Sequence, residues 1–413
     1  MLLIYYNRMP ILSLVSNTYA FNRKFLNVYV LPILITLILT LTFSTSALTQ
    51  EQNPCELAKK ILPRVEALTK ITNKLKFSCM ALNHKDYDNY TNSLVKKSIS
   101  IKDIKIQELL LKKLGILQES YKYTECMMFG TGEQTDALYD MTSRKIILRS
   151  DSAVKPSIIA HELVHMLQDS EYNLKEIGKN KKEIDSIIGL EGLTEGHAMY
   201  YEKEYAKLYK DEELIPAQNL SPTSVENESC NYPEPLASIL YFSYEWGKIF
   251  NANIIKKNIN AFKKIPKSSR EILYPDDYTK GLVPSKVKLK ILFKDNTSMK
   301  LIYKDSLGEY ILRALLKSVS TMSEGILAAK GLVSDEITLS KMIKTNQHKI
   351  SWRFHFENDN DILQLTSVIN KLALQVAGIK INPVSKNWIA TNEKSETWGF
   401  KTHSGDAELV VSF

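Results

Sequence analysis

The sequence predicts an α+β protein, with a mainly helical body that carries a small edge-stranded sheet and a separate α+β domain at the C-terminus. Three observations support this prediction. Apolar residues recur at helical spacing over residues 56–75, 105–117 and 236–262. Residues 137–148 alternate around a polar turn, which is typical of a β-hairpin. From residue 287 onward, short alternating strands (287–293, 350–356, 408–413) are separated by helices (310–319, 361–377).

The first 47 residues have the pattern of an export signal. Residues 25–43 form a nearly unbroken apolar run, which Arg23 and Lys24 precede and small residues ending at Ala47 follow. This order predicts a signal peptide that is cleaved after Ala47. The run is long enough for an uncleaved membrane anchor, but Pro32 and the threonines near its end favour cleavage. We therefore expect a secreted, periplasmic or cell-surface protein that contacts a membrane only if this segment is retained.

The remaining chain divides by character into three parts, at residues 48–120, 121–286 and 287–413. The first is helical and carries no recognisable chemistry, so we expect it to pack on the second. With 413 residues and 44% hydrophobic content, the chain is long enough to bury a sizeable core. The net charge of +8 falls to +5 without Arg8, Arg23 and Lys24, which is too mild and too evenly spread to indicate nucleic-acid binding.

Four cysteines follow the leader, and an even count in an exported chain predicts two disulfides. Three pairings are open. Pairing nearest neighbours in the sequence gives Cys55–Cys79 and Cys126–Cys230, which we adopt as the expectation. No two cysteines have C-x-x-C spacing, so a zinc–thiolate cluster is not indicated.

The stretch His161-Glu162-Leu163-Val164-His165 is the strongest chemical pattern in the chain. On a helix the two histidines project from one face and can hold one zinc ion, while Glu162 can reach a water bound to that metal. Pro156 suits the first turn of this helix, and Asp151 or Ser152 is expected to cap it.

A catalytic zinc usually has three protein ligands and one open position. Residues 189–202 offer the third ligand, because Glu191, Glu195 and Glu202 share one helical face. Gly192 and Gly196 beside them would let this helix approach the first one closely. A solvated acidic stripe is the plain alternative, which fits Glu202 better than the other two glutamates.

An H-E-x-x-H motif with a later helical glutamate resembles the gluzincin clan of zinc peptidases. The string from Glu195 to Glu202 is similar to the ligand helix of the aminopeptidase branch, although Thr194 replaces an asparagine and the distance from His165 is longer. The chain more closely resembles a little-characterised family of secreted zinc metallopeptidases with the patterns H-E-L-V-H-x-L-Q-D and L-x-E-G-x-A, over residues 110–372. That resemblance implies a zincin-like catalytic domain over residues 121–286. It makes Glu195 the third zinc ligand, with Glu191 as the alternative.

Two further expectations depend on this resemblance. Hairpin 137–148 would supply an edge strand that binds extended substrate through its backbone, although a plain structural hairpin is nearly as well supported. In the family-like string at residues 268–278, Tyr274 replaces a histidine of the family. Tyr278 keeps the family position and is a candidate for polarising a substrate carbonyl.

The resemblance implies an exported zinc metallopeptidase that acts on a peptide or protein substrate. Zn²⁺ would be bound by His161, His165 and Glu195, with Glu162 as the general base. The alternative is a catalytically inactive zincin-like module that binds a protein or cell-envelope partner. The intact Glu162 argues against that alternative, because binding alone does not need a base. A purely structural zinc site is disfavoured, because no fourth protein ligand is evident.

Overall fold

The computed structural model describes residues 53–98, 100–129, 135–152, 154–209, 232–294, 298–345 and 347–413. The expected leader and its cleavage after Ala47 lie outside these ranges, as does Cys230. Within the described ranges, every helix is too short or too polar to span a bilayer.

The N-terminal region is helical, as predicted. It contains α1 (Pro54–Thr69), α2 (His84–Ser98), α3 (Ile101–Lys113) and α4 (Tyr123–Phe129). Pro54 occupies the first turn of α1, and the Asn53 side chain caps it. The helix ends at Thr69 rather than residue 75, because Lys70 adopts a left-handed conformation with φ 58°. Helix α2 lies within the part predicted to be helical, although polar residues dilute its apolar positions.

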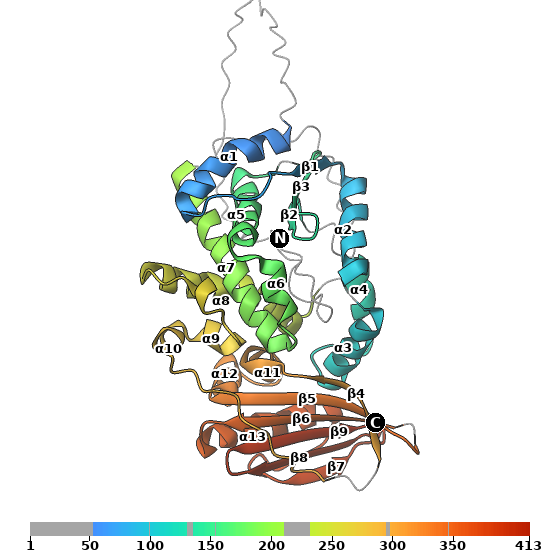
Figure 1. The fold of residues 1–413 in the computed structure, drawn as a ribbon. Coiled ribbons are helices and arrows are strands. Elements are labelled where there is room, and N and C mark those ends of the chain that lie inside the picture. Colours follow the sequence, from blue (N-terminus) through green and yellow to red (C-terminus); the bar gives the residue numbers. More distant parts are fainter. Residues whose placement is uncertain are drawn as a thin grey trace, which may run out of the picture.

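A small sheet lies beside these helices (Figure 1). Its strands are β1 (Cys79–Leu82), β2 (Ala137–Asp140) and β3 (Lys145–Arg149), in the order β1-β3-β2. The predicted hairpin is confirmed: β2 and β3 pair antiparallel, with Tyr139 opposite Ile146. The parallel partner β1 was missed, because a short strand far away in the sequence leaves no local pattern. In this sheet β2 lies at one edge.

The predicted disulfide Cys55–Cys79 is confirmed, and it joins α1 to β1. Cys126 is also disulfide-bonded, and its expected partner Cys230 lies outside the described residues.

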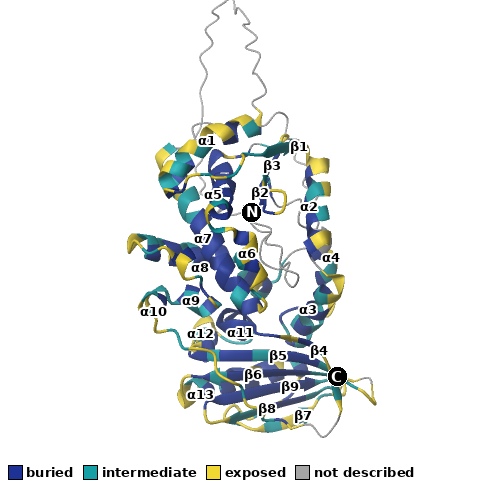
Figure 2. Cartoon of the chain, in the orientation of Figure 1, coloured by how far each residue is buried: buried dark blue, intermediate teal, exposed yellow. Residues whose placement is uncertain are grey.

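The centre of the molecule is formed by α5 (Pro156–Tyr172) and α7 (Ile184–Tyr209). The short α6 (Leu174–Lys179) connects them, and α8 (Glu234–Lys256) packs along α7. Figure 2 shows α5 and much of α7 in dark blue, as buried elements. Most residues of α6 are exposed or half-buried, whereas Asp185, at the start of α7, is buried.

The glycines of α7 do not face α5, so that expectation was wrong. A Cβ on Gly196 would overlap the backbone of Gly247 in α8, and a Cβ on Gly192 would lie 2.8 Å from Ile272. Gly247 in turn faces the Gly192 carbonyl. The glycines therefore admit α8 and the short α9 (Ser269–Leu273), which packs next to it.

The C-terminal part is an α+β unit, as predicted. Its six-stranded antiparallel sheet has the order β4-β5-β6-β9-β8-β7. The strands are β4 (Met299–Asp305), β5 (Leu332–Met342), β6 (His348–Phe356), β7 (Trp388–Thr391), β8 (Thr397–His403) and β9 (Asp406–Ser412). The helices are α11 (Gly308–Lys317), α12 (Met322–Ala329) and α13 (Asp359–Ala377), and α10 (Pro275–Lys280) precedes the sheet. Figure 1 places this sheet at the end of the molecule opposite α1.

Most of the expected C-terminal elements are confirmed by β6, β9, α11 and α13, but the strand predicted at residues 287–293 is absent. That segment pairs with no strand of the sheet. The backbone N–H groups of Leu292 and Phe293 donate instead to the Glu408 carboxylate, at 2.6 and 2.8 Å. Alternation alone could not distinguish this segment from a paired strand.

Residues at the end of β4 form hydrogen bonds with the first turn of α7. The Ile184 N–H donates to Asp305 at 2.8 Å, and the Asp185 N–H donates to the Ser306 carbonyl at 2.9 Å. Asp185 itself accepts hydrogen bonds from the N–H and hydroxyl of Ser269. The C-terminal domain thereby satisfies donors at the start of α7 that a helix cannot satisfy internally.

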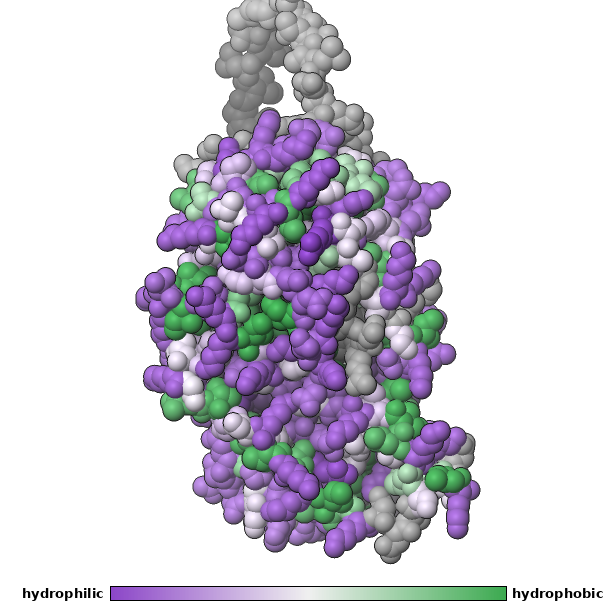
Figure 3. Space-filling model, in the orientation of Figure 1, coloured by the Kyte–Doolittle hydropathy of each residue, from purple (hydrophilic) through white to green (hydrophobic). Residues whose placement is uncertain are grey.

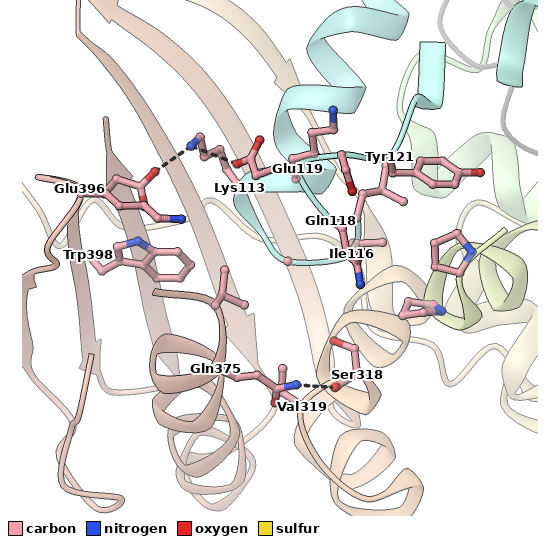
Figure 4. Close-up of a pocket in the computed structure, with 18 of the residues that line it drawn as sticks. Lys113, Ile116, Gln118, Glu119, Tyr121, Ser318, Val319, Gln375, Glu396 and Trp398 are labelled. Atoms are coloured by element: carbon pink, nitrogen blue, oxygen red, sulfur yellow. Dashed lines mark hydrogen bonds and ion pairs between the residues drawn. The ribbon is translucent and has the colours of Figure 1, made fainter. Parts of the chain in front are cut away.

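A second junction connects the end of α3 to the C-terminal domain, around a pocket of about 980 Å³ (Figure 4). Lys113 points between two carboxylates, with Glu396 at 2.7 Å and Glu119 at 3.4 Å. Across the pocket, Gln375 donates to the Ser318 carbonyl.

The outer surface is mostly hydrophilic, with scattered apolar side chains on the face that Figure 3 shows.

Candidate metal centre

Helix α5 carries the histidine pair. Pro156 occupies its first turn, as predicted, but Lys155 precedes the helix and no side chain caps it, so the expected cap from Asp151 or Ser152 is wrong. The helix packs against α1, α7 and β2, so both its apolar arc and its polar arc are buried. The helix ends at Tyr172, and the following Asn173 adopts a left-handed conformation. The H-E-x-x-H motif therefore lies in the middle turns of α5.

Three side-chain atoms from α5 and α7 converge. His161 Nε2 and His165 Nε2 are 3.0 Å apart, and each lies 3.3 Å from Glu195 Oε2. Two ligand atoms that bind a tetrahedral zinc at about 2.0–2.1 Å would be about 3.3–3.4 Å apart. The three side chains are almost completely buried, with exposed fractions of 2%, 0% and 1%. This buried His-His-Glu group could therefore hold a metal ion.

The pKa shifts of His165 and Glu195 favour the deprotonated forms that bind a metal. Burial lowers the pKa of His165 to about 4, so this imidazole is neutral at pH 7. Burial raises the pKa of Glu195, but the two histidines outweigh that effect and hold it below its usual value. For His161, burial lowers the pKa, and hydrogen bonds to Glu195 and Glu202 raise it by more. A carboxylate and imidazole nitrogens that face one another at these distances need a shared proton or a metal ion between them.

Glu202, the glutamate that the solvated-stripe alternative fits best, lies beside His161. Its Oε2 lies 3.0 Å from His161 Nδ1. A carboxylate on Nδ1 keeps a proton there, which leaves Nε2 free to bind a metal. The sequence contained a clue, because Glu202 follows Glu195 by seven residues and hence lies on the same face of α7.

His165 has a different partner. Its Nδ1 lies 3.1 Å from Oε1 of Gln168, which is fully buried one turn further along α5. The sequence analysis noted Gln168 only as part of a family-like string. The contacts of Gln168 could not be predicted from the sequence, because its amide nitrogen contacts residues of α7, which is distant in the sequence.

The alternative ligand Glu191 is outside the converging group. It is buried on α7, and its Oε2 has no hydrogen-bond partner among the described residues. Burial and the nearby Glu195 raise its pKa well above the usual value. The pKa of Glu191 is thus shifted upward, toward the neutral acid, whereas the pKa of Glu195 is shifted downward, toward the carboxylate.

The remaining predicted residues lie in different surroundings. Glu162, next to His161 on α5, is 1% exposed. The Tyr278 hydroxyl donates to the Lys264 carbonyl, and its ring packs against Phe250. Its catalytic role stays a prediction that these contacts do not favour. Tyr244 on α8 is buried, and after burial itself the charge of Glu195 is the main cause that raises its pKa.

Comparison with known proteins adds no relative: no family model, curated protein or solved structure matches the chain.

Proposed function

We propose that the chain is a zinc-dependent metallopeptidase of the zincin type. The observation that carries the proposal is the convergence of His161, His165 and Glu195 beside a buried Glu162. The resemblance to gluzincins requires this set: two histidines and a glutamate as ligands, and the residue after the first histidine as base. The zincin-like assignment is supported by the small sheet, because its edge strand β2 packs on α5.

The donor set suits zinc. Two imidazoles and one carboxylate are a common catalytic zinc set, and they leave the fourth position to water or substrate. When bound there, zinc would lower the pKa of its water to about 7 and polarise the scissile carbonyl.

The chain's own residues would perform the proton transfers and the positioning. Glu162 would accept the proton of the attacking water and donate it to the leaving amine. The backbone of β2 would align an extended substrate by strand addition. The carboxylate of Glu202 and the amide of Gln168 would orient the two histidines.

Export is part of the proposal, and two features support it. The apolar run at residues 25–43 follows basic residues and precedes small ones, in the order of a signal peptide. The disulfide Cys55–Cys79 would persist in an oxidising compartment and not in a reducing cytosol.

Glu162→Gln tests the mechanism. The variant should bind zinc as wild type does and lose peptide hydrolysis, because an amide cannot accept the proton. The assay is digestion of casein and a peptide library with and without a chelator, and Glu171→Gln at the far end of α5 is the control. Equal hydrolysis by Glu162→Gln would refute the mechanism. Zinc binding by wild type without any cleavage would favour the non-catalytic binding module.

A matched pair of variants tests the third ligand. Glu195→Ala should lose stoichiometric zinc, because two histidines alone hold the ion weakly. Glu191→Ala, one turn earlier on the same helix, should retain it. Metal analysis of the purified proteins measures both, and the opposite pattern would assign Glu191 as the ligand.

A further inference from the structure

Gln168 connects three groups that matter to the metal centre. Its Oε1 lies 3.1 Å from His165 Nδ1, and its Nε2 lies 2.9 Å from the Thr194 carbonyl and 3.1 Å from His197 Nδ1. The Thr194 carbonyl directly precedes the ligand Glu195 in the chain. All these contacts are buried.

The chemistry of an amide determines the direction of every bond. A carbonyl only accepts, so the end of Gln168 that faces Thr194 must be its NH₂ group. The second hydrogen of that group points to His197 Nδ1, which must then be an acceptor. Oε1 carries no hydrogen, so His165 Nδ1 must be the donor. One side chain thus assigns the tautomers of two histidines in opposite senses.

The tautomer of His165 determines which of its nitrogen atoms can bind a metal. With its proton on Nδ1, His165 presents a lone pair at Nε2, which faces His161 Nε2 and Glu195 Oε2. His197 carries its proton on Nε2 and is held by edge contacts with Tyr201 and Phe262, at centroid distances of 4.9 and 5.3 Å. Two helices that each carry a ligand are joined through the same amide.

We infer that Gln168 is a positioning residue, which holds His165 in the metal-binding tautomer and ties α5 to α7 beside Glu195. The inference builds on the proposed zinc centre and assigns a role that the H-E-x-x-H motif does not contain. At Nδ1 of His161 the partner is the carboxylate of Glu202, whereas at Nδ1 of His165 it is the neutral amide of Gln168. The two histidines therefore have partners of different charge.

The decisive variant is Gln168→Glu. A carboxylate can still accept from His165 Nδ1, so that histidine should keep its tautomer. It cannot donate to His197, so His197 should move its proton from Nε2 to Nδ1. Imidazole ¹⁵N chemical shifts of the metal-free, full-length protein report each tautomer, and His197→Asn assigns the signals. A wild-type His165 with its proton on Nε2, or an unchanged His197 in Gln168→Glu, would overturn the inference.

Zinc affinity gives a second readout. Gln168→Leu should weaken zinc binding about 10–100-fold, as loss of a hydrogen bond to a ligand typically does, when the apo protein competes with a chromophoric chelator. Gln107→Leu, at a buried glutamine in α3, controls for general damage to the core. Unchanged affinity in a folded Gln168→Leu overturns the role. If zinc binding and tautomers follow the expectation but no peptide is cleaved, the proposed function fails and the positioning role stands.

Discussion

Gly196 of α7 and Gly247 of α8 meet backbone to backbone, so closely that a Cβ on Gly196 would overlap the carbonyl group of Gly247. This contact lies one residue from the candidate ligand Glu195. The pairing of α7 with α8 therefore depends on two positions without side chains, and it places Tyr244 of α8 near the same glutamate.

Gly247→Ala tests the packing of α8 on α7, because a Cβ at this position would lie 2.4 Å from the Gly192 carbonyl oxygen. A glycine-to-alanine change inside an exposed helix would stabilise it by up to about 1 kcal/mol, whereas overpacking a tight interface costs about 1–3 kcal/mol. We expect net destabilisation, measured by chemical denaturation. Glu245→Ala on the exposed side of α8 is the control and should change little. A more stable Gly247→Ala would contradict the close approach.

The buried carboxyl groups at the start of α7 predict a pH dependence. Burial raises the pKa of Asp185 and of Asp305 from 3.8 to about 6. A carboxyl with a higher pKa in the folded chain stabilises the fold when it is protonated. This contribution is fully present below about pH 4 and is lost as the pH rises through 6, on the order of 3 kcal/mol for each group.

Asp185→Asn should remove the contribution of that residue, because an amide keeps the oxygen that accepts from Ser269 and cannot ionise. Relative to wild type, the variant should gain stability between pH 4 and pH 7. Denaturation curves at both pH values give the difference, with the exposed Glu393→Gln as control. Parallel pH dependence in variant and wild type would show that Asp185 does not titrate in this range.

Glu202 should contribute to zinc affinity through His161. Glu202→Ala removes the acceptor at His161 Nδ1, and we expect zinc to bind about 10–100-fold more weakly. Glu204→Ala, two residues further along α7, is the matched control. Competition with a chelator measures both, and equal affinity in the two variants would return Glu202 to a solvent-facing role.

The disulfide Cys55–Cys79 should stabilise the N-terminal region. It closes a loop with a sequence separation of 24, for which chain entropy predicts about 3 kcal/mol. The double variant Cys55→Ala/Cys79→Ala should lose roughly that amount in the free energy of unfolding, measured without reductant. No loss of stability would mean that packing of α1 alone holds β1 in place.

The ion pair between Lys113 and Glu396 couples α3 to the C-terminal domain. Its side chains are only 19% and 15% exposed, so a double-mutant cycle should give about 1 kcal/mol of coupling. Lys113 with Glu119, which is 67% exposed, should couple much more weakly. Coupling of equal size in the two cycles would contradict this assignment.

Local patterns in the sequence determined the elements whose residues interact with near neighbours. The spacing of His161 and His165 predicts one face of one helix, and the alternation at residues 137–148 predicts a hairpin, because helix and hairpin geometry repeat over a few residues. Pro156 in the first turn of α5 and the apolar spacing in α11 and α13 are local patterns as well. For this reason the histidine pair and most C-terminal elements could be predicted.

The tertiary structure decided what depends on contacts between distant segments. Spacing alone allowed Glu191 as well as Glu195, since both lie on one face of α7, and only the placement of α7 against α5 brings Glu195 to the histidines. Glu202 and Gln168 gain their roles the same way, through atoms on the opposite helix. The glycines of α7 were expected to face α5, but periodicity cannot tell which neighbour a helix face meets. That choice is made by the packing of α7 between α5 and α8, which the whole chain determines.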